Sequence, residues 1–159
     1  MRNYMLAGFA VGVLSIGTLA LADGHITEKQ LESATKARQA QMQLYSFNLG
    51  TLGAMAKEEV AYDSASAQTA ADNLATLTSL SQAGYWLPGS DNESMEKTRA
   101  LPAIWADGSE VGAKGKDFVD AVMAMQAAAG TDIDALKAAM GPLGAACSAC
   151  HKDYRQSDD

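Results

Sequence analysis

The two cysteines of this chain stand three positions apart near its C-terminus, and a histidine directly follows the second of them. The segment is Cys147-Ser148-Ala149-Cys150-His151. On an α-helix, residues at positions i, i+3 and i+4 share one face. In a helical segment both thiols and the imidazole would therefore point towards one bound group, and the rest of the fold has to leave room for it.

This spacing is the attachment pattern of c-type haem. The thiols of Cys147 and Cys150 can add to the two vinyl groups along one edge of the haem, and the imidazole of His151 then reaches the iron from the proximal side. Covalent attachment keeps haem on a small protein that could not bury it completely. We therefore expect one covalent haem c, held by Cys147 and Cys150, with His151 as an axial ligand of the iron.

The same cysteines would also suit a redox-active dithiol, a disulfide or half of a zinc site. A thioredoxin-like dithiol needs a βαβ setting, and a structural zinc ion usually takes four Cys or His ligands. The one other histidine of the sequence is His25, near the N-terminus. These considerations favour haem and leave a haem-free dithiol as the weaker alternative.

The N-terminus has the three parts of a secretory signal peptide. Arg2 supplies a positive charge, residues 5–19 are apolar and uncharged, and Ala20-Leu21-Ala22 offers small residues for cleavage. We expect residues 1–22 to be removed and residues 23–159 to form one domain in the periplasm. A retained membrane anchor is the alternative, but the apolar stretch is shorter than the roughly 20 residues that a bilayer requires.

The charge of the chain bears on its partners. The sequence has 12 basic and 19 acidic residues, a net charge of −7. Removal of residues 1–22 takes away Arg2 and no acidic residue, so the remainder is one unit more negative. An acidic surface argues against nucleic acid and anionic membranes as partners. It is compatible with a basic protein partner.

The residue types of the remaining chain favour helices, because Ala, Leu, Met, Gln, Glu and Lys are common and β-branched residues are sparse. A first helix is expected from Thr27 to about Lys57, since Thr27 and Gln30 form a capping-box pattern. Its apolar side chains fall on one stripe, which two polar residues interrupt. The stripe contains Leu31, Met42, Tyr45, Leu49 and Leu52, and the interruptions are Thr35 and Arg38.

Three further helices follow from the same reasoning. The second begins near Asp63 or Ser64 and ends near Gln82, with Leu74, Leu77 and Leu80 expected to be buried. The third covers about residues 110–129 and ends at Gly130, and Thr131 caps a fourth that runs to about Arg155. Four amphipathic helices with mostly short connections predict an all-α fold, an antiparallel four-helix bundle.

Two segments depart from the helical pattern. Residues 84–101 are expected to form a loop with an apolar plug at Tyr85-Trp86-Leu87, and Pro102 opens a short turn through Trp105. Gly141-Pro142 lies inside the fourth helix, where Pro142 removes a backbone hydrogen bond. The fourth helix is therefore expected to be kinked there, or else divided into two pieces.

Several stretches of the sequence share a pattern with one known family. Residues 134–140 precede the Cys-x-x-Cys-His motif and residues 144–155 contain it. Residues 103–106 and 112–116 lie around the start of the third helix, and residues 37–39 contain an Arg-Gln pair. Together they resemble the class II cytochromes c, the cytochrome c′ family. The resemblance covers nearly the whole chain after the signal peptide. It implies a left-handed four-helix bundle, the architecture that cytochrome c′ exemplifies.

The resemblance places Met42, one helical turn after Arg38, at the distal position of the family. In high-spin members an apolar side chain covers that side of the haem, and the five-coordinate iron binds nitric oxide or carbon monoxide. In low-spin members a methionine of the first helix coordinates the iron, which gives a six-coordinate electron carrier. A thioether suits haem iron. We therefore expect Met42 as the sixth ligand, with a core-filling role as the alternative.

For two arginines the sequence is compatible with two roles each. Arg38 either pairs with a haem propionate or influences the distal pocket, or it is a solvated helix charge. Arg155 matches a family arginine near the proximal imidazole, or it stabilises the end of the helix. Tyr154 and Trp105 are expected to serve packing rather than electron transfer, and Tyr45 and Trp86 to lie in the core or in the wall of the haem pocket.

The leading interpretation is a periplasmic monohaem electron carrier that exchanges electrons with a redox partner protein. It is not expected to be an enzyme, because a peroxidase would need distal acid–base residues and the sequence offers no histidine beyond His25 and His151. The alternative is a high-spin protein that binds nitric oxide or carbon monoxide. Members of the resembling family are often homodimers through their first two helices, so the resemblance also leaves a homodimer open.

Overall fold

A computed structural model describes residues 25–157 of the chain. The expected signal peptide, residues 1–22, lies outside the described residues. Four α-helices and one short 3₁₀ helix form the described part. They are α1 (Glu28–Ala56), α2 (Ser64–Thr78), η1 (Pro102–Trp105), α3 (Val111–Ala128) and α4 (Ile133–Tyr154). Within residues 25–157, none of the helices combines the length and the hydrophobicity that a membrane span requires.

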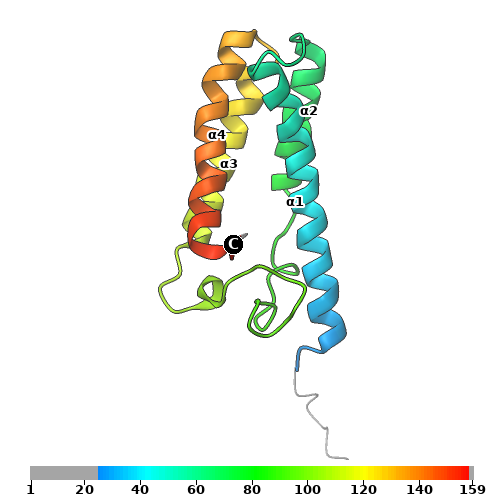
Figure 1. Cartoon of the computed structure of the whole chain (residues 1–159), viewed down its shortest axis with the longest axis vertical. Coiled ribbons are helices and arrows are strands. Elements are labelled where there is room, and N and C mark those ends of the chain that lie inside the picture. Colours follow the sequence, from blue (N-terminus) through cyan, green and yellow to red (C-terminus); the bar gives the residue numbers. More distant parts are fainter. Residues whose placement is uncertain (1–24, 158–159) are drawn as a thin grey trace, which may run out of the picture.

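The helices form the antiparallel four-helix bundle that the sequence predicts (Figure 1). Each helix packs against its neighbour in sequence within the pairs α1–α2, α2–α3 and α3–α4, and α4 also contacts α1. Short turns close one end of the bundle. The long connection of residues 79–110 crosses the other end, where α4 also ends. The two ends of the bundle are therefore built differently, and the Cys-x-x-Cys-His motif lies at the end with the long connection.

Side-chain caps decide where the helices begin. The expected capping box of α1 is confirmed, since the amide of Gln30 donates to Thr27 Oγ1 at 3.3 Å and the amide of Thr27 donates to Gln30 Oε1 at 2.8 Å. The expected cap of α4 at Thr131 is wrong. Asp132 takes that role, because its carboxylate accepts from the amide of Ala135 at 2.8 Å and Asp is a better cap than Thr.

The second helix ends at Thr78, short of the expected Gln82. The hydroxyls of Thr78 and Ser79 donate to backbone carbonyls of the last turn, both at 2.7 Å. Such local hydrogen bonds compete with continuation of a helix. Leu80 therefore lies beyond the helix and is 43% exposed, so the expectation that it is buried is wrong.

The fourth helix runs through Pro142 without interruption from Ile133 to Tyr154. Division into two pieces is thus excluded. Gly141, Pro142 and Ala138 are all exposed. Pro142 has no N–H to donate to the carbonyl of Ala138. Because the site is exposed, water can take the place of that donor, and the carbonyl is not left unpaired inside the protein.

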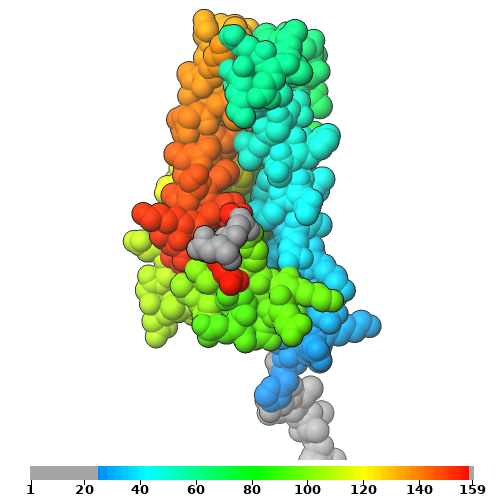
Figure 2. Space-filling model, in the orientation of Figure 1, coloured from blue at the N-terminus to red at the C-terminus, as the bar shows by residue number. Residues whose placement is uncertain are grey.

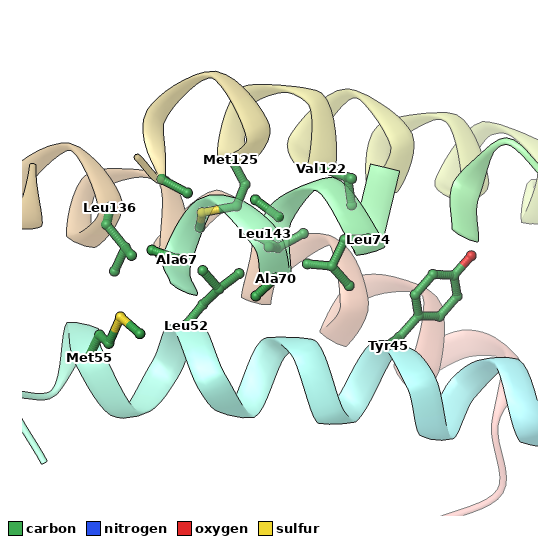
Figure 3. Packing of buried hydrophobic residues seen from close by; sticks show 12 residues of the cluster. Tyr45, Leu52, Met55, Ala67, Ala70, Leu74, Val122, Met125, Leu136 and Leu143 are labelled. Atoms are coloured by element: carbon green, nitrogen blue, oxygen red, sulfur yellow. The ribbon is translucent and has the colours of Figure 1, made fainter. Parts of the chain in front are cut away.

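The apolar core fills one part of the bundle (Figure 3). Its side chains come from all four helices, and small alanines on α2 let the helices approach closely. The cluster contains Tyr45, Leu52, Met55, Ala67, Ala70, Ala71, Leu74, Val122, Met125, Ala129, Leu136 and Leu143. On α1 every member follows Met42, and on α4 every member precedes Cys147. Because α1 and α4 are antiparallel, Met42 and the motif lie beyond the same end of the core.

Leu74→Ala is expected to lower the free energy of unfolding by about 2–5 kcal/mol, because Leu74 is fully buried, with an exposed fraction of 0%, and truncation of its side chain leaves a cavity. Chemical denaturation of the holoprotein measures this. Leu80→Ala makes the same chemical change at an exposed position of the same region and should change the free energy by less than about 0.5 kcal/mol. Equal losses in the two variants would contradict the described core.

Candidate cofactor site

The motif occupies the last two turns of α4, as its spacing predicts. Cys147, Cys150 and His151 are all half-buried. Because all three are helical, the two sulfur atoms and the imidazole share the face expected from positions i, i+3 and i+4. The two thiols are free and form no disulfide with each other. This face can therefore present two thiols and one imidazole to a single bound group.

The thiols are poor candidates for a redox-active dithiol. Burial raises the pKa of Cys147 and also that of Cys150, where the positive charge of Lys114 only partly opposes it. Reactive dithiols need the opposite shift, because the thiolate is the nucleophile. Both thiols stay neutral near neutral pH, which suits residues that are to be joined to a cofactor rather than to exchange disulfides.

The imidazole of His151 is held in its neutral form. Burial lowers its pKa, and the positive charges of Arg155 and Arg99 lower it further. A neutral imidazole is the form that coordinates a metal. The charge of Arg155 thus acts on His151, in agreement with the expected place of this arginine near the proximal imidazole.

Among residues 25–157, no cluster of three or more His, Cys, Asp or Glu side chains is placed to hold a metal ion. A zinc site of the usual kind would need such a cluster. Haem differs from a bare ion in this respect, because the porphyrin supplies four of the iron ligands and leaves only the axial positions to the protein. The residues of the α4 face fit this requirement.

Met42 lies on α1 close to three buried residues. Arg38, Gln41 and Tyr45 are each less than a tenth exposed, whereas Met42 is 40% exposed. A core-filling side chain would be buried, so the structure does not support that role for Met42. Along α1, Met42 instead adjoins the buried positions Gln41 and Tyr45, precedes every core member of this helix, and so lies towards the end of the bundle where His151 stands.

Arg38 is buried, with an exposed fraction of 3%, so the reading as a solvated helix charge is wrong. Its Nη1 donates to Ser90 Oγ at 2.6 Å and to the carbonyl of Tyr85 at 3.3 Å. Its Nη2 donates to Thr98 Oγ1 at 2.7 Å and to the carbonyl of Ser90. The guanidinium also stands 5.1 Å from the ring centroid of Trp86.

All the hydrogen-bond acceptors of Arg38 are neutral, and within residues 25–157 this side chain forms no ion pair. Burial lowers the pKa of Arg38, and the charge of Asp91 only partly offsets this effect. A buried charge is costly unless an opposite charge compensates it. The surroundings of Arg38 therefore favour an additional anionic group.

Of the large aromatic residues, Tyr45 is buried in the core as expected, and Trp86, Trp105 and Tyr154 are half-buried. Tyr45 meets Phe118 of α3 edge to face, with ring centroids 5.1 Å apart. The indole Nε1 of Trp105 donates to the carbonyl of Trp86 at 3.0 Å, and the hydroxyl of Tyr154 accepts from the amide of Glu110 at 2.8 Å. These contacts join the long connection and the start of α3 to the helices around the motif.

Sequence patterns did not reveal the polar partners around the site. Ser90 and Thr98, which hold Arg38, stand in a loop whose composition does not distinguish them from exposed residues. Lys114 of α3 pairs with Asp153 of α4 at 2.9 Å, next to the motif. Lys114 belongs to a stretch that the family resemblance covers, but nothing in the sequence pairs it with Asp153.

Several known proteins are similar to this chain in sequence and in structure. The family model described as Cytochrome C′ matches residues 33–155. Cytochrome c-554 of Cereibacter sphaeroides is 43% identical over 130 residues, which are 82% of this chain and 98% of that protein. The structure of "Cytochrome c' from Rhodobacter Spheriodes" matches with a TM-score of 0.78 and 38% identity, over 80% of this chain and 98% of the other.

A further similar structure contains a bound gas. It is the nitric oxide complex of the L16I mutant of cytochrome c prime from Alcaligenes xylosoxidans. It matches with a TM-score of 0.69 and 34% identity, over 80% of this chain and 97% of that one. The residues that the family model matches, 33–155, include most of the four helices and the α4 motif.

Proposed function

This chain belongs to the cytochrome c′ family, the class II cytochromes c, with one covalently bound haem c, and we propose that it carries single electrons in the periplasm. Haem supplies the one-electron chemistry, and the chain supplies attachment, axial ligands and burial. In this proposal Cys147 and Cys150 hold the haem and His151 is the proximal ligand. A redox partner protein is implied, and no enzymatic role is proposed.

The observation that carries the proposal is the place of Met42. Met42 is 40% exposed and adjoins the buried positions of α1, beyond the core and towards the end of the bundle where His151 lies. A methionine that does not fill the core and adjoins the buried positions of its helix is available for an axial role. Together with His151, Met42 would complete the coordination of the iron and raise its reduction potential.

Arg38 has a supporting role in this proposal. Its buried positive charge has neutral hydrogen-bond partners only, so a haem propionate would provide the negative charge that its surroundings favour. We propose that Arg38 orients the haem through this charge pair, while Ser90 and Thr98 hold the guanidinium in place.

Carbon monoxide and voltammetry together test the proposed function. Carbon monoxide should bind the reduced holoprotein slowly, because Met42 has to leave the sixth position first. Voltammetry should show one reversible one-electron wave, since the ligands are the same before and after electron transfer. Binding of carbon monoxide that is complete on mixing would show an open sixth position and contradict the carrier.

A specific observation favours the alternative function, a high-spin cytochrome that binds nitric oxide or carbon monoxide. A solved structure with 34% identity to this chain is a nitric oxide complex. In that alternative, Met42 covers the distal side without coordinating the iron. The two functions differ in whether sulfur is bound to iron, so the tests above and the Met42 substitution below distinguish them.

Export is the second part of the proposal. Residues 1–22 have the charge, the apolar stretch and the cleavage pattern of a signal peptide. Covalent attachment of c-type haem takes place outside the cytoplasm in bacteria, so export and haem attachment support each other. N-terminal sequencing of the mature protein should begin at Asp23, and a protein that retains Met1 would contradict cleavage.

We also propose a homodimer through α1 and α2. Leu44 and Phe47 are 50% and 72% exposed on α1, and Phe47 borders a groove of about 310 Å³ between α1 and α2. Phe47→Glu is expected to raise the dissociation constant of the dimer about tenfold or more, because it places two like charges in a symmetric interface. Sedimentation velocity measures it.

Met123→Glu is the matched control for this substitution. Met123 is 51% exposed on α3, away from the proposed interface, so the added charge there should leave the association state unchanged. A wild-type protein that is monomeric at all concentrations would contradict the homodimer.

A further inference from the structure

Residues 90–101 cross the end of the bundle that carries the Cys-x-x-Cys-His motif, and we call this segment the strap. In Figure 1 it is part of the green connection that spans the space between α1 and the end of α4. One side of the strap is bound to α1 and the other to the residues that follow His151. We propose that the strap sets the spacing between α1 and α4 at the haem, and thereby whether Met42 reaches the iron, an inference that rests on the proposed function.

The attachment to α1 lies in the turn that precedes Met42. Arg38 donates to both oxygens of Ser90 and to the hydroxyl of Thr98. Its neighbour Gln39 donates from Nε2 to the carbonyl of Lys97 at 2.7 Å. Two consecutive residues of α1 therefore bind the first residue of the strap and its residues 97–98, and Ser90 and Thr98 are themselves buried.

The attachment to α4 lies directly after the motif. Ala100 forms an antiparallel bridge with Arg155. On one side of this bridge the amide of Leu101 donates to the carbonyl of Tyr154 at 3.0 Å, and on the other the amide of Gln156 donates to the carbonyl of Arg99 at 2.8 Å. The strap therefore continues the backbone hydrogen bonding of α4 beyond its last turn.

The strap is also bound to itself, so it cannot lengthen freely. The amide of Asn92 donates to the carbonyl of Ala100 at 2.8 Å, and the amide of Met95 donates to the carbonyl of Asp91 at 2.9 Å. The carboxylate of Asp91 in turn accepts from the amides of Glu93 and Ser94 at 3.0 and 2.9 Å. A segment with these internal bonds transmits a displacement of one attachment to the other.

The hydroxyl of Thr98 connects the two attachments. It accepts from Arg38 of α1 at 2.7 Å and from the amide of Ala100 at 3.2 Å, the residue that bridges to Arg155. A hydroxyl oxygen has two lone pairs, so it can serve both donors at once. Thr98 is therefore the residue at which the strap can be loosened with the smallest chemical change.

The consequence for the haem follows from its attachment. Cys147, Cys150 and His151 tie the haem to α4, so the position of Met42 relative to the iron depends on how α1 is held against the end of α4. Ligand geometry has to be kept within about 0.5 Å for a productive site. The core holds the two helices together only beyond Tyr45 and Leu143, and the strap joins them at the haem end.

Thr98→Val in the full holoprotein tests the proposal, because valine keeps the shape of threonine but removes the shared acceptor. The association rate of carbon monoxide with the reduced protein is expected to rise about tenfold, because the variant leaves buried donors without an acceptor and so weakens the attachment of the strap. The high-spin fraction of the oxidised protein should rise with it. Hydrogen exchange of the amides of Leu101 and Gln156 should become faster, which reports the loosened strap independently of the haem.

Thr76→Val is the matched control. The hydroxyl of Thr76 donates to the carbonyl of Asp72 within α2 at 2.9 Å, so the same chemical change is made at a residue that has no hydrogen bond to the strap. It should leave the spectrum, the carbon monoxide rate and the two amides unchanged. If Thr98→Val does not fold, Gln39→Leu removes one exposed hydrogen bond to the strap and should change the same three quantities in the same direction.

The outcomes separate this proposal from the proposed function. Faster exchange at Leu101 and Gln156 with an unchanged spectrum and carbon monoxide rate would overturn the control of Met42 by the strap. Unchanged exchange would overturn the role of Thr98. A wild-type protein with a high-spin iron would refute the electron carrier. The proposal for the strap would then still predict different carbon monoxide rates for Thr98→Val and the wild type. Equal rates would overturn the proposal for the strap.

Discussion

Simultaneous replacement of Cys147 and Cys150 by serine is expected to abolish covalent attachment of haem. Serine hydroxyls cannot form the thioether bonds that join the haem vinyl groups to the chain, and the two thiols are the only ones in the sequence. Haem staining after denaturing electrophoresis, together with the intact mass of the unfolded protein, measures the loss. The wild type should carry the mass of one haem, and the double variant none.

Ser148→Ala is the control for this experiment. Ser148 stands between the two cysteines and is exposed, so its variant should keep covalent haem at the level of the wild type. A double cysteine variant that retains haem through denaturation would contradict the attachment site. Covalent haem that is missing from the wild type would contradict the whole assignment.

Met42→Ala is expected to convert the iron from low spin to high spin, because alanine cannot supply a sixth ligand. The reduction potential should fall, since Met/His ligation is what raises it. Carbon monoxide should then bind the reduced protein on mixing. Optical spectra of the oxidised and reduced variant, and voltammetry, measure these changes.

Met123→Ala provides the matched control, because Met123 is also about half exposed but lies on α3 outside the core cluster. This variant should have the spectrum and the potential of the wild type. A Met42→Ala variant whose spectrum is unchanged would show that Met42 is not a ligand, and the gas-binding alternative would then be favoured.

The helices and the motif could be predicted because their determinants are local. Thr27 and Gln30 are three residues apart, so their capping box is visible in the sequence and is present in the structure. The face shared by Cys147, Cys150 and His151 also follows from helical spacing alone. Pattern reasoning is reliable where the residues that decide an element lie within one or two turns of each other.

The inner face of α1 shows where such reasoning fails. Thr35 and Arg38 interrupt the expected apolar stripe and are both buried, with exposed fractions of 3%, so the alternative of a solvated charge at Arg38 is wrong. Hydrophobic periodicity assigns polar residues to the surface, but a buried polar side chain is stable when distant residues supply its hydrogen bonds. For Arg38 these partners are Ser90 and Thr98, more than fifty positions away.

The end of α2 and the cap of α4 were misplaced for a related reason. Helix propensity alone extends α2 towards Gln82, whereas the hydroxyls of Thr78 and Ser79 bind backbone carbonyls and end it earlier. Thr131 and Asp132 are both acceptable caps, and the choice between adjacent caps depends on backbone geometry that a sequence does not show. The connection that holds the haem end together is likewise defined by long-range contacts.

The absorption spectrum of the oxidised wild-type holoprotein tests the central claim most directly. Coordination of the iron by Met42 and His151 predicts a low-spin spectrum that includes a charge-transfer band from methionine sulfur to iron. A high-spin, five-coordinate spectrum without that band would contradict the claim that this cytochrome is a six-coordinate electron carrier.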